Sequence, residues 1–177
     1  RSLPNISVVA PCTANEAGEA ISVMIKGGGV GYLRLDKTAA QDAEPSTSFV
    51  IGKSARHEEG SDITLIAIGG ILDEVNIAAV KLKKIGIDAR VIGMHSIKPI
   101  DIDEIIDATI NTGGIVTVEE HNKDGGLGSA VSEVCMDYGF MPKKFLRIGL
   151  GNIYSSIVGS PHYMRSRYDM DSKAIIE

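Results

Sequence analysis

The sequence predicts an α/β fold in which a mostly parallel sheet lies between two layers of helices. Short apolar runs rich in valine and isoleucine alternate with longer segments whose apolar residues recur at helical spacing. The run at residues 62–70 is continuously apolar, as expected for a strand that is buried on both faces. This alternation is typical of βαβ units, which place helices on both faces of a sheet. We therefore expect a three-layer domain, preceded by a smaller strand-helix-strand unit.

The first 36 residues predict that smaller unit. Its strands are expected at residues 6–10 and 31–35. Between them, Thr13 and Glu16 have the spacing of a capping box, apolar residues follow at helical spacing, and three consecutive glycines end the helix. A unit this small buries too little apolar surface to fold alone, so we expect it to pack against a neighbour. Residues 37–48 are polar and predict a linker.

From residue 49 onward, strands and helices alternate regularly. Residues 49–60 predict a strand with an exposed turn, and the buried strand at residues 62–70 leads into an amphipathic helix at residues 71–85. That helix has acidic residues in its first turn and lysines toward its end, which complements the helix dipole. The remaining strands are expected at residues 89–96, 114–121 and 143–151, and the remaining helices at residues 101–110, 126–139 and in two short pieces from Pro161 onward.

Composition and charge narrow the classes of function. Of the 177 residues, 44% are hydrophobic and 23% are charged, and the formal net charge is −5. Such a chain suits a globular domain and offers no basic surface for nucleic acid or anionic lipid. No apolar run is long enough to span a membrane, and the first ten residues lack a signal-peptide core. Cys12 and Cys135 form no CxxC pair, so we expect buried thiols in a reducing, cytoplasmic compartment.

Glu119, Glu120 and His121 form a candidate site at the end of a predicted strand. Glu119 and His121 should face one side and Glu120 the other, at the edge where open α/β sheets bind ligands. His95 ends the preceding strand, so these residues are candidates for acid–base chemistry, or for a metal site together with Asp124. No metal-ligand spacing such as HExxH is present. We favour the alternative, in which these polar groups satisfy a strand-to-helix corner.

The glycine-rich turn at residues 125–129 precedes a helix whose amide groups could hold an anion. The turn is not a GxGxxG sequence, and the alternative is a tight turn with close helix–sheet packing. The GKS sequence at residues 52–54 is not a P-loop, because Thr47 stands where that motif needs its first glycine. No nucleophile elbow or Ser–His–Asp arrangement can be argued from the sequence.

Arg34 stands on an otherwise apolar predicted strand, with Leu33 and Leu35 facing the other way. A guanidinium close to a buried sheet needs an anionic partner. An internal carboxylate and a substrate phosphate satisfy that requirement equally well.

Six segments carry a family resemblance: RSLPNISVVAPCTANEA, GYLRL, IGKSARHEEGSDITLIAIGG, IGIDARVIGMHSIKPID, GGIVTVEEHNKDGGLGSAVSEV and VGSPHYMRSRYDMDSKAI. In order, and over essentially the whole chain, they resemble the carboxyl-terminal half of split bacterial or archaeal transketolases. The resemblance implies that residues 1–36 are the end of a pyrimidine-binding domain for thiamine diphosphate, and that residues 49–177 are a transketolase carboxyl-terminal domain. Thr13 departs from the aspartate usual in the PxDxxE motif of the family, but threonine can also cap the helix.

The resemblance further implies a transferase that moves a two-carbon ketol unit between sugar phosphates. Thiamine diphosphate and Mg would be bound by segments or subunits outside this chain, so we expect no catalytic, cofactor-binding or metal-binding residue here and no activity from this chain alone. Arg34 would bind the substrate phosphate. Expected partners are an amino-terminal thiamine diphosphate-binding domain or subunit, in a homodimer or heterotetramer.

Alternatives to a transketolase are a 1-deoxyxylulose-5-phosphate synthase, a 2-oxoacid dehydrogenase beta subunit, and a non-catalytic domain that binds anions or serves assembly.

Overall fold

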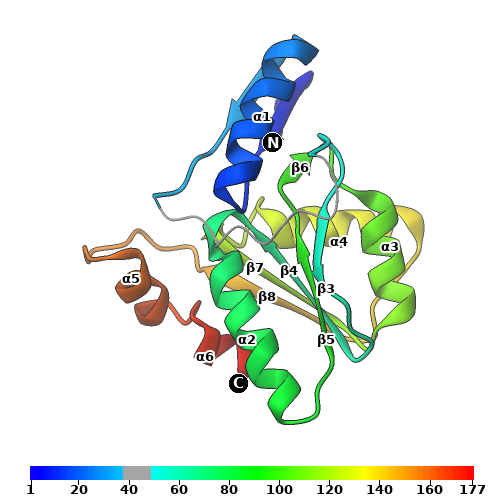
Figure 1. Ribbon diagram of the computed structural model, residues 1–177, viewed down its shortest axis with the longest axis vertical. Helices are drawn as coiled ribbons and strands as arrows, with labels where there is room; N and C mark the ends of the chain where they lie inside the picture. The colour runs from blue at the N-terminus through cyan, green and yellow to red at the C-terminus, as the bar shows by residue number, and fades with distance from the viewer. Residues whose placement is uncertain (38–48) are drawn as a thin grey trace.

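The computed structural model describes residues 1–37 and 49–177 and contains one large sheet and one small sheet (Figure 1). The predicted linker at residues 37–48 lies outside the described residues, apart from Lys37.

The large sheet has the strand order β3-β5-β4-β7-β8. Strands β4, β5, β7 and β8 run parallel, and only β3 is antiparallel, against β5. The mostly parallel sheet expected from the sequence is therefore confirmed. The strands are β3 (Ala55–Glu58), β4 (Ile63–Ile68), β5 (Ala89–Gly93), β7 (Ile115–Asn122) and β8 (Phe145–Leu150).

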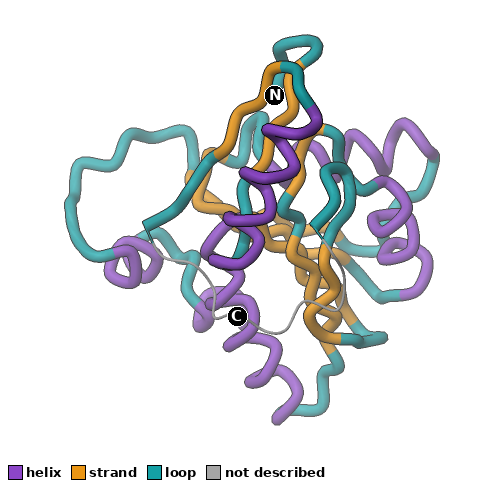
Figure 2. Tube along the Cα trace, turned by 45° about the horizontal axis from the view of Figure 1, so that its top comes forward, coloured by secondary structure: helices purple, strands orange, loops and turns teal. Residues whose placement is uncertain are grey.

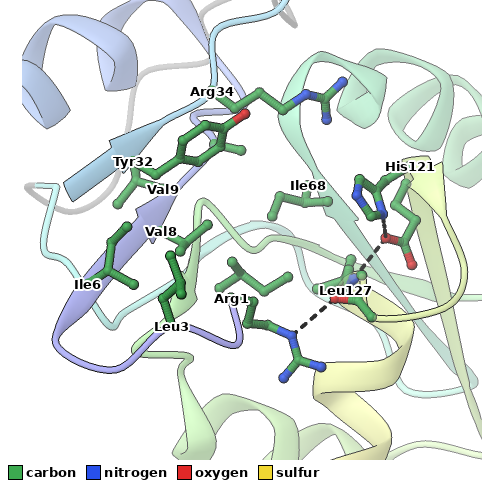
Figure 3. Close-up of a pocket in the computed structure, with 15 residues that line it drawn as sticks. Arg1, Leu3, Ile6, Val8, Val9, Tyr32, Arg34, Ile68, His121 and Leu127 are labelled. Carbon is green, nitrogen blue, oxygen red and sulfur yellow. Dashed lines mark hydrogen bonds and ion pairs between the residues drawn. The ribbon is translucent and has the colours of Figure 1, made fainter.

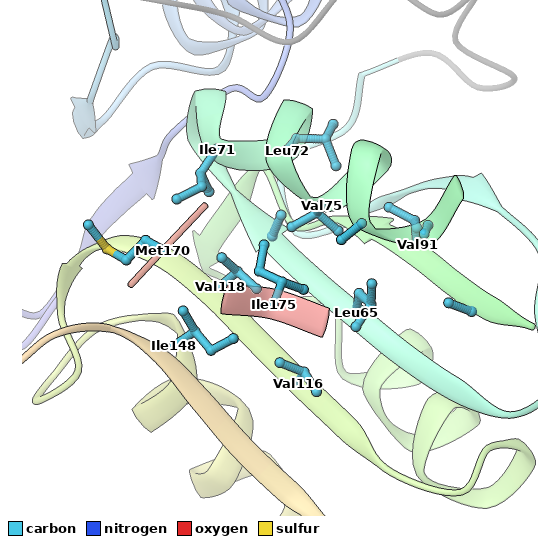
Figure 4. Close-up of a cluster of buried hydrophobic side chains, with 14 of the residues drawn as sticks. Leu65, Ile71, Leu72, Val75, Val91, Val116, Val118, Ile148, Met170 and Ile175 are labelled. Carbon is cyan, nitrogen blue, oxygen red and sulfur yellow. The ribbon is translucent and has the colours of Figure 1, made fainter. Parts of the chain in front are cut away.

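Helices cover both faces of this sheet, as Figure 2 shows. One face packs against α2 (Leu72–Lys84) and α6 (Ser172–Ile176), in a core that includes Leu65, Val75 and Val118 (Figure 4). The other face packs against α3 (Ile102–Asn111) and α4 (Leu127–Tyr138). The short helix α5 (Pro161–Arg167) precedes α6. The three-layer architecture follows from the sequence pattern, because the central strands β5, β4 and β7 carry apolar residues on both of their sides.

Local capping signals set several helix ends. Thr13 and Glu16 form the predicted capping box at the start of α1 (Ala14–Gly27). The side chain of Asp101 accepts a hydrogen bond from the backbone of Glu104 at the start of α3. Gly139 ends α4 in the left-handed region, with a φ of 74°.

The small sheet joins the amino-terminal unit to the rest of the chain. Parallel strands β1 (Ile6–Val9) and β2 (Val30–Leu33) flank α1 in sequence, and β6 (Ser96–Lys98) pairs antiparallel with β1. The single strand predicted over residues 89–96 is therefore wrong. The chain leaves the large sheet after Gly93, and the carbonyl of His95 accepts a hydrogen bond from the backbone of Ala10 at 2.9 Å.

The amino-terminal unit presents large apolar side chains to solvent. Val30 is 68% exposed and Ile25 is 77% exposed, and Leu3, Tyr32 and Leu35 are also exposed. Figure 1 shows that α1 and its two strands extend away from the large sheet. Exposure on this scale in so small a unit indicates a surface that another segment covers.

Both cysteines are buried free thiols, as predicted. Among the residues that the structure describes, no helix combines the length and apolar character needed to cross a membrane.

Candidate functional site

The order of strands reverses between β4 and β7. From β4 the chain passes to β5 on one side, and it then crosses over to β7 on the other side. In open α/β sheets, ligands bind at the carboxyl ends of the strands that flank such a switch point. Here those ends carry Ile68 and Glu119, which are paired across the two strands.

A cavity of about 350 Å³ lies at this point, and we call it the switch-point pocket. Val8, Val9 and Tyr32 of the small sheet line one side, and Ile68 and Leu127 of the large domain line the other (Figure 3). Most of the lining is apolar, and the polar groups at its edges come from Arg1, Arg34, Glu119 and His121. A largely apolar cavity with a few polar groups is typical of a small-molecule site.

Arg34 borders the pocket but lies just after β2, because β2 ends at Leu33 and the predicted strand continued to Leu35. The side chain of Arg34 is 30% exposed, and its Nη2 lies 2.8 Å from Oδ1 of Asp36. The same nitrogen donates a hydrogen bond of 3.4 Å to the carbonyl of Glu120. An internal carboxylate is therefore one partner of Arg34. A phosphate is not needed to explain the position of this guanidinium.

Asp36 is a residue that the sequence pattern did not single out, because it stands next to the predicted linker. Its other carboxylate oxygen accepts a hydrogen bond of 2.9 Å from the backbone of Gly70, at the start of the helical segment that follows β4. Asp36 thus joins the amino-terminal unit to the large domain.

Glu119 occupies the amino-terminal end of α4. Its Oε2 accepts a hydrogen bond of 2.8 Å from Leu127, and its Oε1 accepts one of 2.9 Å from Gly128. The carboxylate is buried, and burial raises its pKa even though both amides lower it. An anion site at residues 125–129 is therefore not supported, because an internal carboxylate already uses these donors.

Gly126 shows how closely the turn approaches this carboxylate. A Cβ atom on Gly126 would lie 1.8 Å from Oε2 of Glu119. The glycine therefore permits close packing, which is the alternative that the sequence left open for this turn.

Glu120 and His121 have separate surroundings. Glu120 accepts hydrogen bonds of 2.8 and 3.1 Å from Arg165 of α5, which is buried. His121 is exposed, and its Nδ1 lies 2.7 Å from the carbonyl of Asn122. Within residues 1–37 and 49–177, no three His, Cys, Asp or Glu side chains are grouped to hold a metal ion. The strand-to-helix corner is the interpretation that this geometry favours.

His95 does not join that corner. It is buried beside the start of α1, where its Nδ1 lies 3.4 Å from Oε1 of Glu16 and its ring packs against Phe49. Burial would raise the pKa of Glu16, but the nearby imidazole of His95 and the backbone N–H of Cys12 bring it below its ordinary value. His57 lies near both groups, and burial lowers its pKa.

We predict that acidification below about pH 6.5 destabilises the chain through His57. The folded protein resists protonating this buried ring, whereas the unfolded chain takes up the proton at the ordinary pKa. The stability is thus present above the unfolded-state pKa and is lost as the pH falls toward the lower folded-state value.

Urea unfolding between about pH 7.5 and about pH 5.5 measures this loss, and a His57→Gln variant should show a shallower pH dependence. Asn152, which is exposed and cannot titrate, provides the control variant, Asn152→Ser, which should keep the dependence of the original chain. Equal pH dependence in the original chain and in His57→Gln would contradict the prediction.

Comparison with known proteins places these features in context. The family model of the transketolase C-terminal domain matches residues 52–175. A protein named as one of the subunits of an apulose-4-phosphate transketolase, from Phocaeicola vulgatus, is 32% identical over 177 residues, which cover 99% of this chain and 55% of that protein. The 1-deoxy-D-xylulose-5-phosphate synthase of Desulforudis audaxviator is 31% identical over 179 residues, which cover 99% of this chain and 28% of that protein.

A solved structure described as a split gene transketolase, inactive beta4 tetramer, is similar with a TM-score of 0.91 and 30% sequence identity. The match covers 99% of this chain and 57% of that chain. The chain therefore spans about half the length of the transketolase relatives it matches.

Proposed function

The chain belongs to the transketolase family through its carboxyl-terminal domain, and we propose that it is the carboxyl-terminal portion of an enzyme that transfers a two-carbon ketol unit between sugar phosphates. The observation that carries this proposal is the match over 99% of the chain to a protein named as a transketolase subunit. The similarity to a split-gene transketolase structure supports the same conclusion.

We propose that residues 1–36 are the end of a thiamine diphosphate-binding domain and that residues 49–177 form the carboxyl-terminal domain, with residues 37–48 between them. The exposed apolar side chains of the amino-terminal unit support this division, because they need a covering segment. The start of the family match at residue 52 agrees with it.

The family implies thiamine diphosphate, which supplies carbanion stabilisation when it is bound. The described residues do not fit this cofactor. They include no grouped metal ligands, and Glu119 fills the helix terminus that could otherwise face a diphosphate. We therefore propose that segments or subunits outside this chain hold the cofactor and its divalent metal, and that the chain acts in the cytoplasm within a homodimer or heterotetramer.

We propose that Arg34 contributes to binding the substrate phosphate. It borders the switch-point pocket, and both of its contacts within the described residues use Nη2. Nη1 and Nε are the nitrogens that this arrangement leaves for a ligand oxygen. Nη1 and Nε lie on different edges of the guanidinium, so each can donate a single N–H to a ligand oxygen while Nη2 stays with Asp36.

We predict that purified residues 1–177 do not transfer a ketol unit, even with added thiamine diphosphate and Mg. The same sequence within its longer subunit, assembled with a thiamine diphosphate-binding partner, should turn over a ketose phosphate donor and an aldose phosphate acceptor. A coupled assay of the aldose phosphate released from the donor measures both reactions. Turnover by residues 1–177 alone would contradict the assignment, and an assembled enzyme that uses only pyruvate as donor would favour the synthase alternative.

A further inference from the structure

We propose that Asp36 is a positioning residue that holds the guanidinium of Arg34 at the mouth of the switch-point pocket. The inference rests on the proposed function, in which Arg34 binds the substrate phosphate. Asp36 itself is not proposed to touch the substrate.

Two hydrogen-bonding contacts fix the carboxylate of Asp36 between the two parts of the chain. Oδ1 lies 2.8 Å from Nη2 of Arg34, and Oδ2 accepts the backbone N–H of Gly70 at 2.9 Å. The side chain of Asp36 is 12% exposed, so solvent screens the ion pair less than it would on an open surface.

The backbone of the large domain at Gly69 and Gly70 packs closely against this carboxylate. Gly69 has a φ of +75°, and a Cβ atom there would lie 2.4 Å from Oδ2 of Asp36 and 4.0 Å from Nη1 of Arg34. Gly70 belongs to the 3-10 turn that leads into α2, and the start of a helix favours a negative charge. The backbone of the large domain therefore fixes the position of Asp36 independently of Arg34. Asp36 can then hold the guanidinium of Arg34 in one orientation.

Arg34 lies one residue beyond β2, and its backbone still donates a hydrogen bond of 2.9 Å to Val9 of β1, so it is the long side chain that needs support. A free arginine side chain loses rotamer entropy when it binds a phosphate. Asp36 and the carbonyl of Glu120 hold one end of the guanidinium. A substrate phosphate then meets a preoriented N–H group of Nη1 or Nε, which strengthens binding without a new contact.

The test uses the assembled enzyme carrying Asp36→Asn, assayed with an aldose acceptor in its phosphorylated and unphosphorylated forms. We expect the KM for the phosphorylated acceptor to rise about tenfold, with kcat within about twofold and the KM for the unphosphorylated acceptor unchanged. A KM for the phosphorylated acceptor that stays the same or falls would overturn the inference, and so would an equal rise for both acceptors.

Asp103→Asn is the matched control, because Asp103 is 86% exposed and pairs with Lys53 on the surface. It should leave both KM values unchanged. If Asp36→Asn fails to fold, Asp36→Ser replaces it, because serine keeps a small hydrogen-bond acceptor near Gly70. The same rise in KM for the phosphorylated acceptor is expected.

Arg34→Ala separates this inference from the proposed function. If Arg34→Ala does not discriminate between the two acceptors, Arg34 does not bind phosphate and the premise fails. If Arg34→Ala discriminates but Asp36→Asn does not, only the positioning role fails. Since Asp36 acts through Arg34, adding Asp36→Asn to Arg34→Ala should cause no further rise in KM.

Discussion

Replacing Glu119 with alanine is expected to lower the free energy of unfolding by about 3–4 kcal/mol. The carboxylate is buried and accepts hydrogen bonds from two backbone amides at the start of α4. Alanine would leave both N–H groups of Leu127 and Gly128 without these partners, in a place that water reaches poorly. It would also leave a cavity beneath the turn, where Gly126 packs directly against the carboxylate.

Urea unfolding at about pH 7.5 measures this effect, and Glu59→Ala is the matched control. Glu59 also accepts charged hydrogen bonds, from Arg56, but its side chain is mostly exposed. Its loss should change the free energy of unfolding by less than about 1 kcal/mol. A Glu119→Ala variant as stable as Glu59→Ala would show that the start of α4 does not depend on this carboxylate.

Glu119 also shows which features of the candidate site the sequence can predict and which it cannot. Strand alternation correctly predicts that Glu119 and Glu120 face opposite sides, and their contacts go to α4 and α5 respectively. The pattern also predicts a helix after a glycine-rich turn, and it leaves open whether the first amides of that helix bind an anion. It cannot show that this helix returns over the end of its own strand, because that placement depends on packing between elements.

Elements whose signals come from residues close together in the sequence were predictable, because they do not depend on packing between elements. Thr13 and Glu16 cap their helix through contacts only a few residues apart, and apolar periodicity located the helices of the large domain. The error at residues 89–96 involves a distant partner. The run looks continuous in sequence, but its last residue begins β6, which pairs with β1 near the start of the chain.

Arg34 was predictable as a residue that needs an anion, but its partner was not. Asp36 stands only two residues away, at the boundary of the predicted linker, and its role depends on the backbone of Gly70 in another part of the chain. The apolar neighbours of Arg34 indicated the need for an anion, although the structure leaves this side chain 30% exposed. The choice between an internal carboxylate and a ligand depends on which elements meet, and the structure places the carboxylate of Asp36 beside the guanidinium.

Replacing Arg165 with methionine is expected to destabilise the chain by about 2–3 kcal/mol. Arg165 is buried in α5 and pairs with Glu120 at the end of β7, at 2.8 and 3.1 Å. Methionine keeps the apolar stem but leaves Glu120 with an unpaired charge, and the side chain of Glu120 is only 20% exposed. The cost therefore comes mainly from the carboxylate that remains.

The double variant tests this explanation. Removing both charges, with Arg165→Met and Glu120→Gln together, should cost less than Arg165→Met alone, because the carboxylate of Glu120 is then no longer left without its partner. Lys83→Met is the control, since Lys83 forms an ion pair with Glu58 in an exposed place and its loss should have little effect on the free energy of unfolding. If the two substitutions at residues 165 and 120 were simply additive, the pair would not act as a unit, and the attachment of α5 to β7 would need another explanation.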